Sequence, residues 1–228
     1  CKRNNKVSYK NRLLKYPFEN DLKSLGNKDN YECIRDLIFN DYEKKFHNPK
    51  NMYEWLYKTF GKSISDKYLI PYNEKVWNIN IKKLSMVWSE RIPNPPKKDI
   101  LKSSIGLDTE GYKHQLFYHY PKRKGYRAIF KNWVKKDDII FNNPISKIYL
   151  KNKTIFVKSK NSVREYEKVV TTMPLPDLIN ATKEWVPKKI VAQSKKLIIN
   201  PMYVVSLGIL GKDENKYTAI YFPEKDFL

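Results

Sequence analysis

The stretch Ile70-Pro71-Tyr72-Asn73-Glu74-Lys75-Val76-Trp77 is the most informative part of this sequence, and Arg91 follows its tryptophan fourteen residues later. It places two aromatic rings, an ammonium and a guanidinium in one short region at the end of a helical pattern. Aromatic rings stack on flat ligands, and a guanidinium holds two phosphate oxygens at once. The stretch therefore predicts a binding site for a ligand that has a flat ring and a phosphate.

The composition around this stretch indicates a folded globular protein. The chain has 228 residues, of which 41% are hydrophobic and 14% aromatic, enough for one large domain or two small ones. Its net charge of +21 comes from 45 basic and 24 acidic residues. Most of the excess is lysine, whereas phosphate and base readers favour arginine. We interpret the charge as a solvated basic surface, with an anionic partner (nucleic acid, membrane surface or phosphorylated metabolite) as the alternative.

The cysteines and the apolar runs bear on where the protein acts. Cys1 and Cys33 form no CxxC pair and no cluster with histidine, so we expect neither a disulfide framework nor a metal site. We find no signal peptide and no apolar run long enough to span a bilayer. These features predict a cytoplasmic protein without a membrane span. The start at Cys1 and the strand-like end at Leu228 predict a piece of a longer protein.

Periodicity divides the chain near Asn143-Pro144, where a helical pattern gives way to strands. Before this point the patterns predict a hairpin over 7–18 with Asn11 at its corner, helices at 19–25, 28–46, 51–61, 64–70, 81–90, 96–105 and 126–135, and a strand at 115–120. After it they predict strands at 148–150, 154–158, 166–172, 203–210 and 217–222, and a helix at 177–182. Asn51 and a Ser63/Asp66 capping box are the expected helix starts, and Pro71 is expected to bend the chain. The predicted fold class is α+β.

Six stretches occur in an order that resembles a known family. They are Leu14–Asn20, Pro71–Trp77, Glu90–Pro93, Phe117–Gly125, Val169–Pro174 and Tyr221–Glu224. Together they resemble the FAD-dependent flavoproteins of the UDP-galactopyranose mutase and protoporphyrinogen-oxidase-like (amine-oxidase-type) branch. The resemblance covers nearly the whole chain.

The resemblance implies a Rossmann-type FAD domain with an inserted substrate domain. On this basis residues 1–143 are a substrate domain, mostly helical with strands, and residues 177–228 add strands to it. Residues 144–176 are the strand meander of the FAD-binding half. The expected architecture is a helical and antiparallel-sheet substrate domain with a meander from a Rossmann-like FAD domain.

The resemblance also assigns substrate-binding roles. Trp77 would lie beside the flavin and the sugar, and Arg91 would bind the diphosphate. Tyr72 would stack on the ligand or hydrogen-bond to it, and Lys75 would fix the loop by a backbone contact. Asn20 would offer its amide to a sugar hydroxyl.

Three of these residues also have a purely structural interpretation. Trp77 is equally well a core aromatic, and Asn20 a helix cap. Arg91 is alternatively paired with Glu90 or Asp99, an ion pair of little value when exposed.

The cofactor prediction concerns Lys122, Arg123 and Gly125 in a basic turn. The first two are candidates to contact cofactor phosphate, although simple turn residues are the alternative. None of the seven glycines forms the GxGxxG motif, whose backbone N–H groups bind a pyrophosphate. We therefore expect FAD to be the cofactor of the complete protein and not to bind this chain stably by itself.

The sequence thus predicts a part of an FAD-dependent enzyme, inactive alone, that acts on a small phosphorylated or nucleotide-linked substrate. A nucleotide-sugar mutase is the first interpretation, in which the flavin carries the chemistry and no side chain is named as catalytic. An amine-oxidase-like or protoporphyrinogen-oxidase-like oxidoreductase is the second. A non-catalytic basic module for nucleic acid or anionic surfaces is the third, and the absence of a nucleic-acid-binding motif disfavours it.

Overall fold

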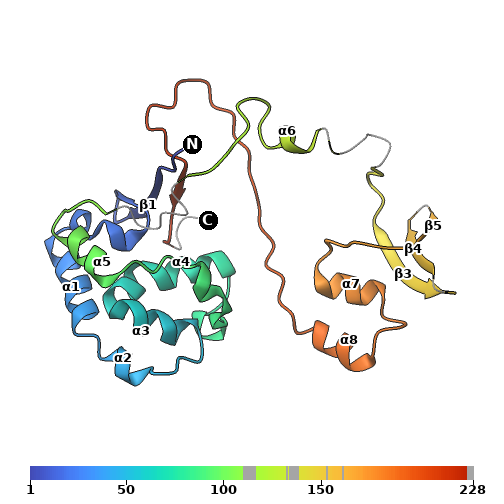
Figure 1. Ribbon diagram of the computed structural model, residues 1–228, viewed down its shortest axis with the longest axis horizontal. Coiled ribbons are helices and arrows are strands. Elements are labelled where there is room, and N and C mark those ends of the chain that lie inside the picture. Colours follow the sequence, from blue (N-terminus) through green and yellow to red (C-terminus); the bar gives the residue numbers. More distant parts are fainter. Residues whose placement is uncertain (110–116, 132, 134–138, 153, 161, 225–228) are drawn as a thin grey trace. The chain divides into compact units, whose positions relative to one another are not determined.

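The computed structural model describes residues 1–109, 117–131, 133, 139–152, 154–160 and 162–224 (Figure 1). The chain divides into two compact units. The first comprises Cys1–Tyr120 and Ser206–Leu228, and the second comprises Pro121–Val205. Residues 121–143 lie in the second unit, together with the strands that follow them. Which of these segments belong to a substrate domain and which to an FAD half stays a prediction.

A small mixed sheet contains strands from both chain segments of the first unit. Its order is β2-β1-β6, with β1 at Asn5–Tyr9, β2 at Arg12–Lys15 and β6 at Ala219–Tyr221. Lys10 and Asn11 form the turn with φ of 47° and 61°, the left-handed geometry of a two-residue hairpin turn. The predicted hairpin is confirmed. Because β6 runs parallel to β1, the sheet is not the purely antiparallel one that was expected.

Helical segments make up most of the first unit. In chain order they are η1 (Phe18–Asn20), η2 (Leu22–Leu25), α1 (Asn27–Ile38), α2 (Tyr42–Lys45), α3 (Met52–Ile64), the π-helical η3 (Ser65–Leu69), α4 (Ile70–Trp77), η4 (Ile81–Lys83), η5 (Met86–Arg91) and α5 (Lys97–Ser104). Buried side chains from the sheet and these helices form one core, with Val7, Phe18, Leu37, Leu56, Phe60 and Tyr68 at its centre.

Two predicted helix boundaries are confirmed and two are wrong. Asn51 caps α3, because its Oδ1 accepts a hydrogen bond of 3.0 Å from the Glu54 N–H. Pro96 directly precedes α5, as expected. Gly61 does not end α3 but kinks it, and the chain continues to Ile64. The Ser63/Asp66 capping box does not form, since both side chains bond elsewhere.

Two of the longer predicted helices also differ from the observed elements. The expected helix over 28–46 breaks after Ile38, and α2 follows as a separate turn. The expected helix over 81–90 is replaced by the 3₁₀ turns η4 and η5. Pro71 does not end the helical run, because the π-helical η3 passes directly into α4, with Leu69 and Ile70 both in the right-handed helical conformation.

The second unit consists of an antiparallel sheet and short helices. The sheet has the order β3-β4-β5, formed by Ile145–Lys151, Thr154–Ser159 and Val163–Tyr166. The helices are α6 (Arg127–Phe130), α7 (Leu175–Ala181) and α8 (Lys188–Ser194). The indole Nε1 of Trp185 donates to the Ile148 carbonyl at 2.9 Å and ties the α7–α8 connection to β3. The chain is therefore α+β, as predicted.

Several predictions for the second half need correction. The third strand ends at Tyr166, and Val170 is 95% exposed, so residues 166–172 are not a buried strand. Residues 203–210 form no strand either, although β6 confirms the one predicted after them. Helix α8 was not predicted. Of the expected strand at 115–120 and helix at 126–135, residues 115, 116, 132, 134 and 135 lie outside the described residues.

No helix among the described residues is long and apolar enough to cross a membrane.

Candidate functional site

A cavity of about 150 Å³ lies inside the first unit, between the end of the β1–β2 hairpin and the helices α4 and η5. Its lining includes Tyr16, Glu19, Tyr68, Tyr72, Trp88 and Arg91. Two of the predicted site residues, Tyr72 and Arg91, thus meet at one cavity. Four other polar or aromatic groups that face them were not predicted as ligand contacts.

The aromatic wall of this cavity is a set of packed tyrosine rings. Tyr68 and Tyr72 are four residues apart, so they share a helical face, and their rings stack at 5.3 Å. The Tyr221 ring of β6 lies 5.0 Å from Tyr16 and 5.6 Å edge-on from Tyr72. Phe18 continues the row on the core side, stacked on Tyr68 at 4.9 Å. Residues distant in sequence therefore build one continuous aromatic surface.

Glu19 is the most unusual group at the cavity. Its side chain is 1% exposed, and neither carboxyl oxygen has a hydrogen-bond partner among the described residues. Burial raises the pKa of Glu19 to about 8, so the group is mostly protonated at neutral pH. A buried polar group without a partner destabilises a fold, and such groups are rare in native proteins. Glu19 therefore presents a neutral acid, both donor and acceptor, to whatever fills the cavity.

The tyrosines supply further donors. Burial raises the pKa of Tyr16, Tyr68 and Tyr72, the last to about 12, and so keeps the three phenols protonated at neutral pH. The Tyr68 hydroxyl is buried and has no partner among the described residues. Together with Glu19 it gives the cavity two unsatisfied polar groups that a bound molecule can satisfy.

Arg91 brings positive charge to the rim of the cavity. It is exposed, and the structure shows no ion pair between it and another described residue. Asp99, one of the partners considered from sequence, instead lies 3.6 Å from Lys102. The Arg91 guanidinium is therefore free to bind an anion.

Trp77 and Lys75 do not line the cavity but contact residues next to it. Trp77 does not line the cavity, but its ring packs edge-on against Trp88, which does, at 4.9 Å. Lys75 Nζ donates to the carbonyl oxygens of Phe222 and Glu224, both at 2.8 Å. This is the backbone contact proposed for Lys75, and it holds the segment that follows Tyr221.

Asn20 is not among the residues that line the cavity, although it directly follows Glu19, which does line it. It is buried, and its Oδ1 accepts a 3.2 Å hydrogen bond from the Thr109 hydroxyl. Its Nδ2 has no partner among the described residues. The structure therefore does not bring Asn20 to the residues predicted to bind the sugar with it.

The structure places the predicted cofactor residues in a turn of the second unit, and their role toward FAD stays a prediction. Lys122 and Arg123 are exposed, and Gly125 and Lys124 adopt left-handed φ angles of 61° and 67° in an open turn of the second unit. Among the described residues no buried polar group or row of backbone N–H groups gathers there, and the sequence has no GxGxxG loop that would serve instead. The described residues thus do not fit FAD by themselves. Among the described residues there is also no cluster of three or more metal-binding side chains.

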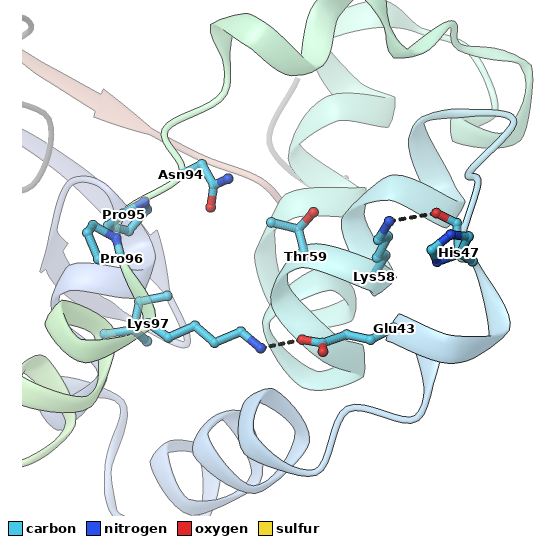
Figure 2. Close-up of a pocket in the computed structure, with 9 residues that line it drawn as sticks. Glu43, His47, Lys58, Thr59, Asn94, Pro95, Pro96 and Lys97 are labelled. Carbon is cyan, nitrogen blue, oxygen red and sulfur yellow. Dashed lines mark hydrogen bonds and ion pairs between the residues drawn. The ribbon is translucent and has the colours of Figure 1, made fainter.

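A second, more open pocket of about 560 Å³ lies between α2, α3 and the start of α5 (Figure 2). Its cations are already engaged. Lys97 pairs with Glu43 across the pocket, and Lys58 Nζ donates to the His47 carbonyl at 2.7 Å. No predicted site residue lines this pocket. The tyrosine-lined cavity is therefore the stronger candidate site.

Sequence reasoning missed Glu19, Tyr16, Tyr68 and Trp88. Tyr16 and Glu19 belong to the quoted stretch Leu14–Asn20, from which only Asn20 was selected. The available signal was an acid, Glu19, that directly follows the apolar residues Pro17 and Phe18. The burial of Glu19, however, depends on Tyr68 and α5, which are distant in sequence.

The fold belongs to the class seen in amine-oxidase-type flavoproteins, as the sequence resemblance implied. The structure matches the crystal structure of reduced UDP-galactopyranose mutase with a TM-score of 0.73 and 25% sequence identity, over 87% of this chain and 44% of that chain. A protoporphyrinogen oxidase from Exiguobacterium sp. 255-15 matches with a TM-score of 0.46 and 14% sequence identity, over 79% of this chain and 43% of that chain. The chain spans less than half the length of these structures. No family model matches the chain.

Proposed function

We propose that this chain is the substrate-binding part of an FAD-dependent enzyme that acts on a nucleotide sugar in the manner of a mutase. The observation that carries the proposal is the match to reduced UDP-galactopyranose mutase over 87% of the chain. The sequence motif that led to the same family contributes Tyr72 and Arg91 to a single cavity, which supports it further.

The chemistry of the cavity suits such a ligand. The cavity has a volume of about 150 Å³, which is on the order of the space that one six-membered ring needs, so we expect the sugar ring of the ligand to occupy it. Tyr16 and Tyr72 offer faces for that ring, and Glu19 offers a donor and an acceptor. The charged part of the ligand lies at the rim, where Arg91 binds phosphate oxygens in pairs.

FAD, when the complete protein binds it, supplies the redox or nucleophilic chemistry of the reaction. The residues of this chain bind and orient the substrate. Arg91 holds the diphosphate, the tyrosine wall excludes water from the ring, and Lys75 keeps the wall in place through its two backbone contacts.

Binding of UDP and UDP-galactopyranose, measured by isothermal titration calorimetry with and without FAD, tests the proposal. Arg91→Lys should weaken binding about 10- to 100-fold, because a point charge replaces a bidentate contact. Lys98→Met, at an exposed lysine of α5, is the matched control and should bind as the unmodified chain does. Equal affinity of Arg91→Lys and the control removes Arg91 from the site. Salt-dependent binding to unrelated DNA, with no binding of UDP ligands, favours a basic binding module instead.

A further inference from the structure

Strand β6 lies at an edge of its sheet. It pairs in parallel with β1, with Val7 opposite Tyr221, and no described strand pairs with its other side. Such an edge presents unpaired backbone N–H and C=O groups and accepts a further strand readily. The described part of the sheet thus has room for one more strand beside β6.

The segment that leads into β6 is apolar and uncovered. Within Ser206–Leu210, Leu207 is 80% exposed, Ile209 87% and Leu210 102%. Figure 1 shows this part of the chain as an extended stretch without strand pairing, followed by β6 beside β1. Three large apolar side chains so exposed in five residues indicate a surface that becomes covered.

The connection between this segment and β6 already reverses the chain. The Asp213 Oδ1 accepts a 3.0 Å hydrogen bond from the Lys216 N–H, and Lys216 has a left-handed φ of 50°. A three-residue hairpin loop ends in such a left-handed residue. Beyond it the Thr218 N–H donates to the Asn4 carbonyl at 3.0 Å, which fixes the second arm beside β1.

This turn also sets the register of a hairpin. With Glu214–Lys216 as the loop, Asp213 lies opposite Tyr217, which places Leu210 opposite Ile220 and Ile209 opposite Tyr221. Cross-strand partners share a face of the sheet, so Ile209 would lie on the face of Tyr221 and of the fully buried Val7. The register that the turn sets thus places the apolar side chain of Ile209 on the buried face of the sheet.

We propose that Ser206–Leu210 is a strap that pairs antiparallel with β6 and covers Tyr221. Tyr221 packs against Tyr16 and Tyr72 of the candidate cavity, at 5.0 Å and 5.6 Å. The docked strap would therefore cover the side of β6 that faces away from β1 and add a second layer of support to a ring that already packs on the cavity wall. This inference concerns the fold of the chain and does not depend on which ligand the cavity binds.

A disulfide cross-link tests the register. In a Cys1→Ser background, which removes the exposed thiol and leaves the buried Cys33, Leu210→Cys with Ile220→Cys should form an intramolecular disulfide under mild oxidation. Partners in a hairpin have Cα atoms about 4.5–5.5 Å apart, within disulfide reach. Leu207→Cys with Ile220→Cys is the control, offset along the strand by about 10 Å. The first pair should cross-link at least tenfold faster.

Equal cross-linking rates for the two pairs would overturn the strap. So would disulfide-linked dimers from the first pair, because the segment would then pair with a second copy. Hydrogen exchange of the unmodified chain gives an independent reading. Backbone amides in 206–210 should exchange at least tenfold more slowly than in an unstructured peptide, and exchange at the unstructured rate would refute docking.

Discussion

The Lys75 ammonium lies 2.8 Å from the carbonyl oxygen of Phe222 and so joins α4 to the chain beyond β6 across 147 residues. A second contact of 2.8 Å reaches the Glu224 carbonyl. This lysine belongs to the motif from which the family resemblance began. Its two contacts hold the segment that follows Tyr221, whose ring packs against Tyr16 and Tyr72 of the candidate cavity.

Lys75→Met should destabilise the chain by about 1–3 kcal/mol, because two carbonyl groups lose a charged hydrogen-bond donor. The free energy of unfolding in urea measures the change. Lys83→Met, at an exposed lysine after the same helix, should alter it by less than about 0.5 kcal/mol. If the two variants are equally stable, the Lys75 contacts contribute nothing to the fold.

Glu19 should make stability fall as pH rises through neutrality. Burial raises its pKa from 4.5 to about 8, so between these values the folded chain retains a proton that the unfolded chain releases. The stabilising effect is complete below pH 4.5 and is lost as pH rises to 8, at about 1.4 kcal/mol per pH unit. Glu19→Gln should abolish this slope in urea unfolding at pH 5, 6.5 and 8. Glu90→Gln, at an exposed acid, should keep it, and a slope retained in Glu19→Gln would mean that another group titrates.

Features that depend on local chemistry could be predicted from sequence. The Lys10–Asn11 turn, the Asn51 cap and the helix start after Pro96 each rest on a few neighbouring residues. The helix predicted at 81–90 and the strand predicted at 203–210 are wrong, because an apolar repeat in the sequence does not show whether another element lies beside it. Residues 81–90 form 3₁₀ turns in place of a regular helix. Residues 203–210 pair with no described strand and so form none themselves.

The candidate site divides in the same way. Tyr72 and Arg91 come from a motif, and both line the cavity. Glu19 could not be recognised, because its protonation results from burial by residues distant in sequence. Trp77 does not line the cavity and packs edge-on against Trp88, which does. A motif therefore identifies the neighbourhood of a site, whereas the depth of each side chain follows from tertiary packing.

Asp29 should set the acid limit of stability. Burial alone would raise the pKa of Asp29, but hydrogen bonds from Lys10 at 2.7 Å and Lys67 at 3.0 Å outweigh it and hold the pKa at about 2. The folded value lies below the unfolded value of 3.8, so the stabilising effect is present above pH 3.8 and is lost as pH falls to 2. Asp29→Asn should lower the free energy of unfolding at pH 7 by about 2 kcal/mol.

The measurement for Asp29 is urea unfolding at pH 7, 4 and 2.5, where the difference between variant and unmodified chain should shrink as pH falls. Asp108→Asn is the control, since that carboxylate is fully exposed and lies 3.8 Å from Lys15. A difference that stays constant with pH would mean that the variant acts through packing and not through charge.

Gly61 should tolerate no side chain at all. It kinks α3 with a φ of 73°, and a Cβ there would lie 2.2 Å from the Asp36 carbonyl oxygen and 2.7 Å from its carbon. Both atoms are backbone of α1, so relief requires the two helices to separate. Gly61→Ala should therefore destabilise the chain by more than about 3 kcal/mol, from the clash and the left-handed strain together. Gly208→Ala, where no atom lies within 4 Å of the added carbon, should have little effect. Thermal unfolding followed by far-UV circular dichroism compares the two, and a Gly61→Ala variant as stable as Gly208→Ala would show that α1 and α3 do not approach this closely.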